Sequence, residues 1–243
     1  MHIFSYYNKG YMEHHLSIEE SIRFGWEKTR THSSIVFQVL LTLFAVQIAQ
    51  QIVQRVLDGT LEGAVANAIL FILSIVLGVG FTLITLRIAQ GRHAAYADIF
   101  PPVNVWVSYL GATILAAIIM LVPLLIALVA CLLAFAVLPQ MAAMVAAAII
   151  ILIGAIAAAY FALRYALVRF AILDDSDITK SLRTSARATI GHKWWLLGFS
   201  IVLCLLNILG AILLLVGLLV TIPVTMFAFA HVYVRLHGHN HAE

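Results

Sequence analysis

The sequence predicts an all-α polytopic membrane protein, a transmembrane helical bundle of about six spans. Of its 243 residues, 63% are hydrophobic and only 10% are charged, whereas soluble domains average about 45–50% apolar residues. The apolar residues also form long runs without charges, and a run of about 18 or more predicts a membrane span. A soluble core cannot bury so much apolar surface, so lipid is the expected solvent.

We divide the chain into three parts: a cytoplasmic segment 1–33 with an amphipathic helix, a transmembrane domain 34–236 and a histidine-rich tail 237–243. The many charges before the first apolar run have the wrong pattern for a cleavable signal peptide, so the first span should stay as an anchor.

The first two spans are predicted at 34–57 and 64–86, because a polar turn with two glycines, 58–63, separates two apolar runs. Prolines 101 and 102 then break the chain, since proline disfavours helix at itself and at the residue before it.

The third and fourth spans are predicted at 106–138 and 141–163, with Pro139 and Gln140 between them. The third run is longer than the ~20 residues that a bilayer needs, so it should tilt or kink, and Pro123 is the expected kink.

The last apolar stretch, 194–236, is about twice as long as one span and contains no polar loop. We place two spans here, 194–213 and 216–236, with the turn between Gly210 and Gly217. A single bent helix is the alternative that the sequence leaves open.

Basic residues predict the orientation, because they mark the cytoplasmic side of short loops. With six alternating spans, only Arg55 falls on the outer side. The residues on the other side are Lys9, Arg23, Lys28, Arg30, Arg87, Arg92, Arg164, Arg169, Lys180, Arg183, Arg187, Lys193 and Arg235. Both termini are therefore expected in the cytoplasm. The basic residues are scattered and form no patch with aromatic residues, so no nucleic-acid partner is expected despite the net charge of +3.

A short repeat precedes two of the predicted hairpins at a constant offset of 160 residues. Ile18, Ser21, Ile22, Arg23, Thr29 and His32 match Ile178, Ser181, Leu182, Arg183, Thr189 and His192. In each copy the apolar positions share one face of a helix. We interpret 17–31 and 177–191 as amphipathic helices on the inner leaflet; a chance match between helical sequences is the alternative.

Several motifs of the second half carry a family resemblance. They are Arg169–Asp174, Ser181–Leu182, Ser185, Thr189–Gly191, Trp194 and Val216–Pro223. In these motifs the chain resembles the bacterial six-span proteins of the YciC type and is similar to the membrane domain of some glycerophosphodiester phosphodiesterases. The resemblance implies a multi-pass protein of the bacterial inner membrane. Those phosphodiesterases also carry a catalytic barrel with acidic metal ligands, which has no counterpart in this sequence, so their activity is not implied.

Amide side chains form the main candidate site. Gln47, Gln50, Gln51 and Gln54 occupy one arc of the first span, while Asn67 and Ser74 share a face of the second. They have two interpretations: a polar path or ligand site, or hydrogen bonds between helices, which are common in membrane proteins. Asn207 in the fifth span carries the same signal more weakly.

Metal binding has weak support. His237, His239 and His241 alternate in the tail, and imidazoles bind transition metals, but no acidic or cysteine ligand completes a site. Asp174, Asp175 and Asp177 precede the second amphipathic helix, where Asp177 is expected to cap it. We predict no metal and no cofactor.

The function expected from the sequence is non-enzymatic. The common hydrolase and nucleotide-binding motifs are absent, and no charged residue lies in the middle of a predicted span. The expected partners are membrane lipids, other proteins or further copies of the chain, with a role in envelope organisation as one form of this function. A small-solute permease or channel is the alternative, although ion-coupled transporters usually need a charge within the membrane.

Overall fold

The structure is a computed structural model that describes residues 17–175, 177–213 and 217–239. Within these ranges the chain is all-α, and six helices are long and apolar enough to cross a membrane. They are α2 (Ser33–Val56), α3 (Leu61–Ala89), α4 (Val103–Val137), α5 (Gln140–Arg164), α8 (Lys193–Ile212) and α9 (Leu218–His239). The predicted fold class is therefore confirmed: the chain is a multi-pass membrane protein.

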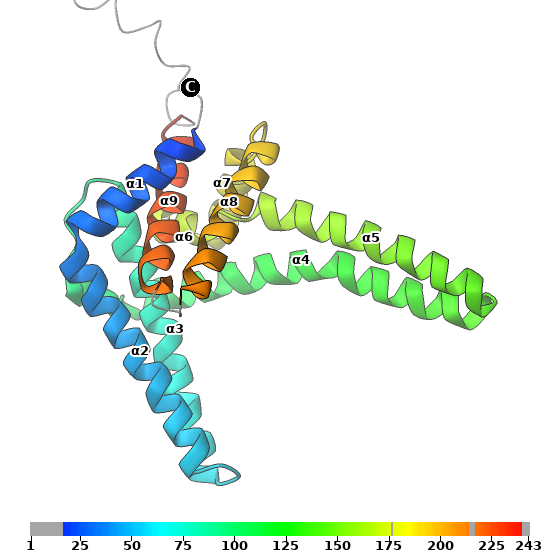
Figure 1. The fold of residues 1–243 in the computed structure, drawn as a ribbon, viewed down its shortest axis with the longest axis horizontal. Coiled ribbons are helices and arrows are strands. Elements are labelled where there is room, and N and C mark those ends of the chain that lie inside the picture. Colours follow the sequence, from blue (N-terminus) through cyan, green and yellow to red (C-terminus); the bar gives the residue numbers. More distant parts are fainter. Residues whose placement is uncertain (1–16, 176, 214–216, 240–243) are drawn as a thin grey trace, which may run out of the picture.

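The long helices form hairpins that do not share one direction. Figure 1 shows α2 and α3 leaving the centre of the molecule one way, and α4 and α5 leaving it another way. α4 continues for 35 residues with Pro123 inside it. Residues 194–236 form two helices, α8 and α9, which approach closely near the turn: a Cβ on Gly217 would lie 2.7 Å from the Gly210 Cα.

A hub of short and long helices joins the hairpins. It contains the end of α3, α6 (Val168–Asp175), α7 (Ile178–Ala188), α8 and α9. Its largest fully buried side chains include Tyr233, Phe170, Phe199 and Leu196. The distal ends of the hairpins have no such core, and Leu61 and Val137 are 82% and 80% exposed. Exposed apolar side chains of this kind are expected where lipid is the solvent.

The connection between the two hairpins is fixed by the 3-10 helix η1 (Tyr96–Ile99). Ile99 is fully buried, and Gly80 of α3 packs directly against its backbone. Asp98 pairs with Arg87 at 2.7 Å and accepts a hydrogen bond from the Ala95 amide at 2.9 Å. Although partial burial alone would raise the pKa of Asp98, the Ala95 amide and the Arg87 guanidinium together hold it below the ordinary value of 3.8.

The N-terminal amphipathic helix α1 (Ile18–Thr31) packs along α9 in the opposite direction. Three contacts follow one another along the two helices. Glu20 pairs with Arg235 at 2.6 Å, the Phe24 and His231 rings stack at 4.2 Å, and Gly25 lies against the Val224 backbone. The hub therefore includes α1.

The repeated residues occupy equivalent buried positions in α1 and α7. Ser21 and Ser181 are both buried, and so are Gly25 and Ser185, which are also 160 residues apart. Ser185 donates a hydrogen bond to the Arg164 carbonyl at 3.1 Å. The two helices use the same face, but α1 packs on α9 whereas α7 packs mainly on α6 and α4.

Candidate functional site: an amide groove and an apolar groove

The amides predicted from the sequence come together between α2 and α3. They line one open groove of about 480 Å³. The residues around it are Gln47, Gln50, Gln51, Gln54, Asn67, Ala68 and Phe71. This volume is within the 300–1,000 Å³ range of small-molecule sites.

Local sequence explains this arrangement. The helical period places the four glutamines on one arc of α2, beside the buried Val46 that faces α3. Gly59 has a φ of 72°, which favours glycine and makes a tight turn. The Thr60 hydroxyl then caps α3 by accepting a hydrogen bond from the Gly63 amide at 3.0 Å. Because the turn is short, Asn67 lies opposite the glutamines.

The amide side chains of the groove have no hydrogen-bond partner in the part of the chain that the structure describes. Across the described residues, none of the five amide side chains makes a hydrogen bond, and three of them, Gln47, Gln51 and Gln54, are exposed. A primary amide can donate two hydrogen bonds and accept two. Leaving these groups unpaired in lipid costs free energy, so the groove is suited to a polar occupant.

The end of the same hairpin is charged. Arg55, Asp58 and Glu62 are exposed, and none of them forms an ion pair with another residue in the described ranges. A positive and two negative groups therefore lie next to the amide groove at the tip of α2 and α3.

Two other predicted polar residues lie outside this groove. The Ser74 hydroxyl donates to the Phe71 carbonyl at 2.7 Å within α3. The Asn207 amide donates to the Leu203 carbonyl at 3.0 Å within α8, and its buried carbonyl oxygen has no hydrogen-bond partner among the described residues. Neither contributes to the amide groove.

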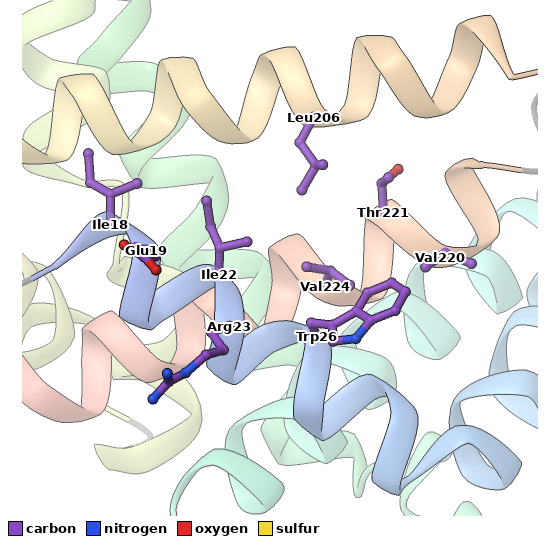
Figure 2. A pocket seen from close by; sticks show the side chains of 9 residues that line it. All are labelled: Ile18, Glu19, Ile22, Arg23, Trp26, Leu206, Val220, Thr221 and Val224. Carbon is purple, nitrogen blue, oxygen red and sulfur yellow. The ribbon is translucent and has the colours of Figure 1, made fainter.

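A second groove, which sequence reasoning missed, lies between α1, α8 and α9 (Figure 2). Its volume is about 650 Å³. It is lined by Ile18, Glu19, Ile22, Arg23, Trp26, Leu206, Val220, Thr221 and Val224. Ile18, Ile22 and Trp26 repeat every four residues, so the apolar stripe was visible in the sequence. The helices that it faces could be found only from the structure.

The acidic residues before α7 have two different roles. Asp177 caps the helix by accepting a hydrogen bond from the Lys180 amide at 3.0 Å, as expected. Asp174 instead faces the hub, where it accepts hydrogen bonds from Gln90 at 3.2 Å and from the Tyr233 hydroxyl at 3.3 Å. This contact joins α3, α6 and α9.

The histidine tail is only partly described. The His237 ring lies 3.7 Å from the Asp174 carboxylate and stacks on Tyr233. The side chains of His239 and His241 lie outside the described residues. In the part of the chain that the structure describes, no three or more His, Cys, Asp or Glu residues are grouped so that they could hold a metal.

Comparisons with protein-family models, with curated proteins and with solved structures find no significant match to this chain.

Proposed function

We propose that the chain is a non-enzymatic multi-pass membrane protein that assembles with a second copy of itself through the amide groove. One observation carries this proposal: five amides of α2 and α3 line a common groove and have no hydrogen-bond partner in the described chain. A function that depends on contact between helices needs such a surface, and no catalytic group is required for it.

A second copy fits the groove because amides complement themselves. Each carboxamide carries donors and acceptors, so the same stripe on another copy offers partners for all of them. In a two-fold dimer the same surface occurs on both sides. If the two-fold axis of the dimer runs along the membrane normal, Arg55 of one copy lies at the same depth as Asp58 and Glu62 of the other. These opposite charges then attract each other at the tip of the α2–α3 hairpins.

The expected strength is moderate. Hydrogen bonds between membrane helices average about 0.6 kcal/mol and reach about 1–2 kcal/mol. Several amide pairs together therefore supply a few kcal/mol, and apolar neighbours such as Phe71 add packing.

A permease or channel is the second candidate, favoured by the polar lining of the 480 Å³ groove. The groove has walls from α2 and α3 only, so a closed path would need grooves from several copies. In that case the amides would form hydrogen bonds with water and solute, and not with the amides of another copy.

The double substitution Gln47→Leu/Gln51→Leu separates these functions. It removes hydrogen-bonding groups without adding volume, and both side chains are exposed, so the fold should persist. We expect the purified protein to change from dimer to monomer in mild detergent, as measured by light scattering. Ile52→Ala, on the face of α2 away from α3, is the matched control and should stay dimeric.

The same variants also test the alternative in liposomes. If wild-type protein is monomeric, and solute flux into liposomes disappears in the double variant while thermal stability is unchanged, the assembly proposal is wrong and the permease is the better account.

The cellular membrane in which the protein lies, and its orientation there, are also part of the proposal. The resemblance to YciC-type proteins supports a bacterial inner-membrane location, and a role in envelope organisation is consistent with a protein that works through assembly. The pair between Glu20 of α1 and Arg235 near the end of α9 supports termini on one side of the membrane. The positive-inside pattern then supports the cytoplasmic side.

A further inference from the structure

The groove between α1, α8 and α9 changes from charged to apolar along its length. Figure 2 shows Glu19 and Arg23 toward the start of α1, while Trp26, Val220 and Val224 lie further along. Ile22 and Leu206 point into the space between α1 and α8 (Figure 2). One end of the groove is thus charged, as the headgroup layer of a bilayer is, and the rest is apolar, as the acyl-chain layer is.

The charged end of the groove lies beside the end of α9. Arg235, which pairs with Glu20, is close to the end of the candidate span Leu218–His237. Val224, on the apolar part of the groove, is 11 residues earlier, which is about 16 Å along a helix. The groove is therefore long enough to hold an extended acyl segment beside a headgroup.

We propose that this groove binds one phospholipid of the surrounding bilayer, with an acyl chain between α1 and α8 and a zwitterionic headgroup of the phosphoethanolamine type at Glu19 and Arg23. The Arg23 guanidinium binds the phosphate, and the Glu19 carboxylate binds the primary ammonium. These two side chains are exposed and form no ion pair with another described residue.

The surroundings favour a lipid over a protein helix. The outer surface of α8 next to the groove is apolar and exposed at Leu205 and Leu209, so lipid contacts its rim. A helix with its side chains is about 10–12 Å wide, whereas an acyl chain is narrow enough to lie between Ile22 and Leu206. The volume of 650 Å³ is also typical of a small-ligand site.

The test uses the full chain in vesicles that contain phosphatidylethanolamine, phosphatidylglycerol and phosphatidylcholine in equal amounts. After gentle extraction, native mass spectrometry counts the lipids that stay bound. We expect one phosphatidylethanolamine per chain in the wild type. Ile22→Trp and Leu206→Trp fill the groove from opposite sides and should each reduce its occupancy at least tenfold. Ile208→Trp should not, because Ile208 is exposed and lies about 200° around α8 from Leu206.

Charge variants test the headgroup. Glu19→Gln should remove the preference for phosphatidylethanolamine over phosphatidylglycerol, and Arg23→Gln should weaken retention of both about tenfold, the loss expected for one charge-assisted hydrogen bond. Thermal unfolding of each variant shows whether the fold persists, and having two filling variants allows for one that fails to fold.

Three results would overturn the lipid site. They are lipid retention equal to that of the wild type in both filling variants, no preference for phosphatidylethanolamine in the wild type, or a protein dimer that dissociates when the groove is filled. The amide groove lies on α2 and α3, so failure of this proposal leaves the assembly proposal intact, and the reverse also holds.

Discussion

Replacing Gly80 with alanine is expected to destabilise the protein by roughly 2–3 kcal/mol. The added Cβ would overlap the backbone of Ile99, which is fully buried and cannot move aside as a flexible side chain could. Overpacking a core site costs about 1–3 kcal/mol and occasionally more. The contact between Gly80 and Ile99 holds η1 on α3, so η1 should detach from α3 in this variant.

Gly78 provides a matched control in the same helix. A Cβ at Gly78 meets no atom within 4 Å, and alanine is about 1 kcal/mol better than glycine in a helix. Thermal unfolding in detergent, followed by circular dichroism, should therefore show a lower Tm for Gly80→Ala and an equal or higher Tm for Gly78→Ala. Equal Tm values for the two variants would mean that η1 does not pack on α3 as described.

Gly25→Leu is expected to detach α1 from α9, at a cost of several kcal/mol in the free energy of unfolding. Any Cβ here would overlap the Val224 backbone, and leucine adds further atoms to a buried contact between two helices. The pair of Glu20 and Arg235 and the stacked rings of Phe24 and His231 depend on the same close approach. These contacts should be lost together.

Limited trypsin digestion measures this release, because Arg23 and Lys28 lie within α1. In the wild type the helix should resist cleavage, whereas in Gly25→Leu it should be cut at least tenfold faster. Gly78→Leu is the control, since a Cβ at Gly78 of α3 meets no atom within 4 Å. Unchanged cleavage in a folded Gly25→Leu protein would contradict the packing of α1 on α9.

The membrane class could be predicted because its signal is local. Each span is a run of apolar residues, and Asp58, Gly59, Pro139 and Gln140 interrupt these runs between adjacent helices. The amide groove was predictable for the same reason. The helical period aligns the glutamines of α2, and the tight turn at Gly59 brings Asn67 opposite them.

Contacts between distant segments could not be predicted in this way. Hydropathy does not specify the direction of each hairpin, because either direction leaves the same apolar surface to lipid. The helix on which α1 packs could not be predicted either. The apolar stripe of α1 at Ile18 and Ile22 fits a bilayer surface or another helix equally well. From the sequence, Asp174 was known only to precede the second amphipathic helix; its contact with Tyr233 joins residues 59 positions apart.

Disulfide cross-linking of copies in the native membrane tests the assembly proposal most directly. With the exposed Cys204 first replaced by alanine, Gln51→Cys places a thiol in the amide groove. Ile52→Cys places one about 100° further around α2, at an exposed position that does not line the groove. If copies assemble through the amide groove, we expect a cross-linked dimer for Gln51→Cys and a monomer for Ile52→Cys under the same mild oxidation. A monomer for both, or equal cross-linking at both positions, would contradict assembly through the amide groove.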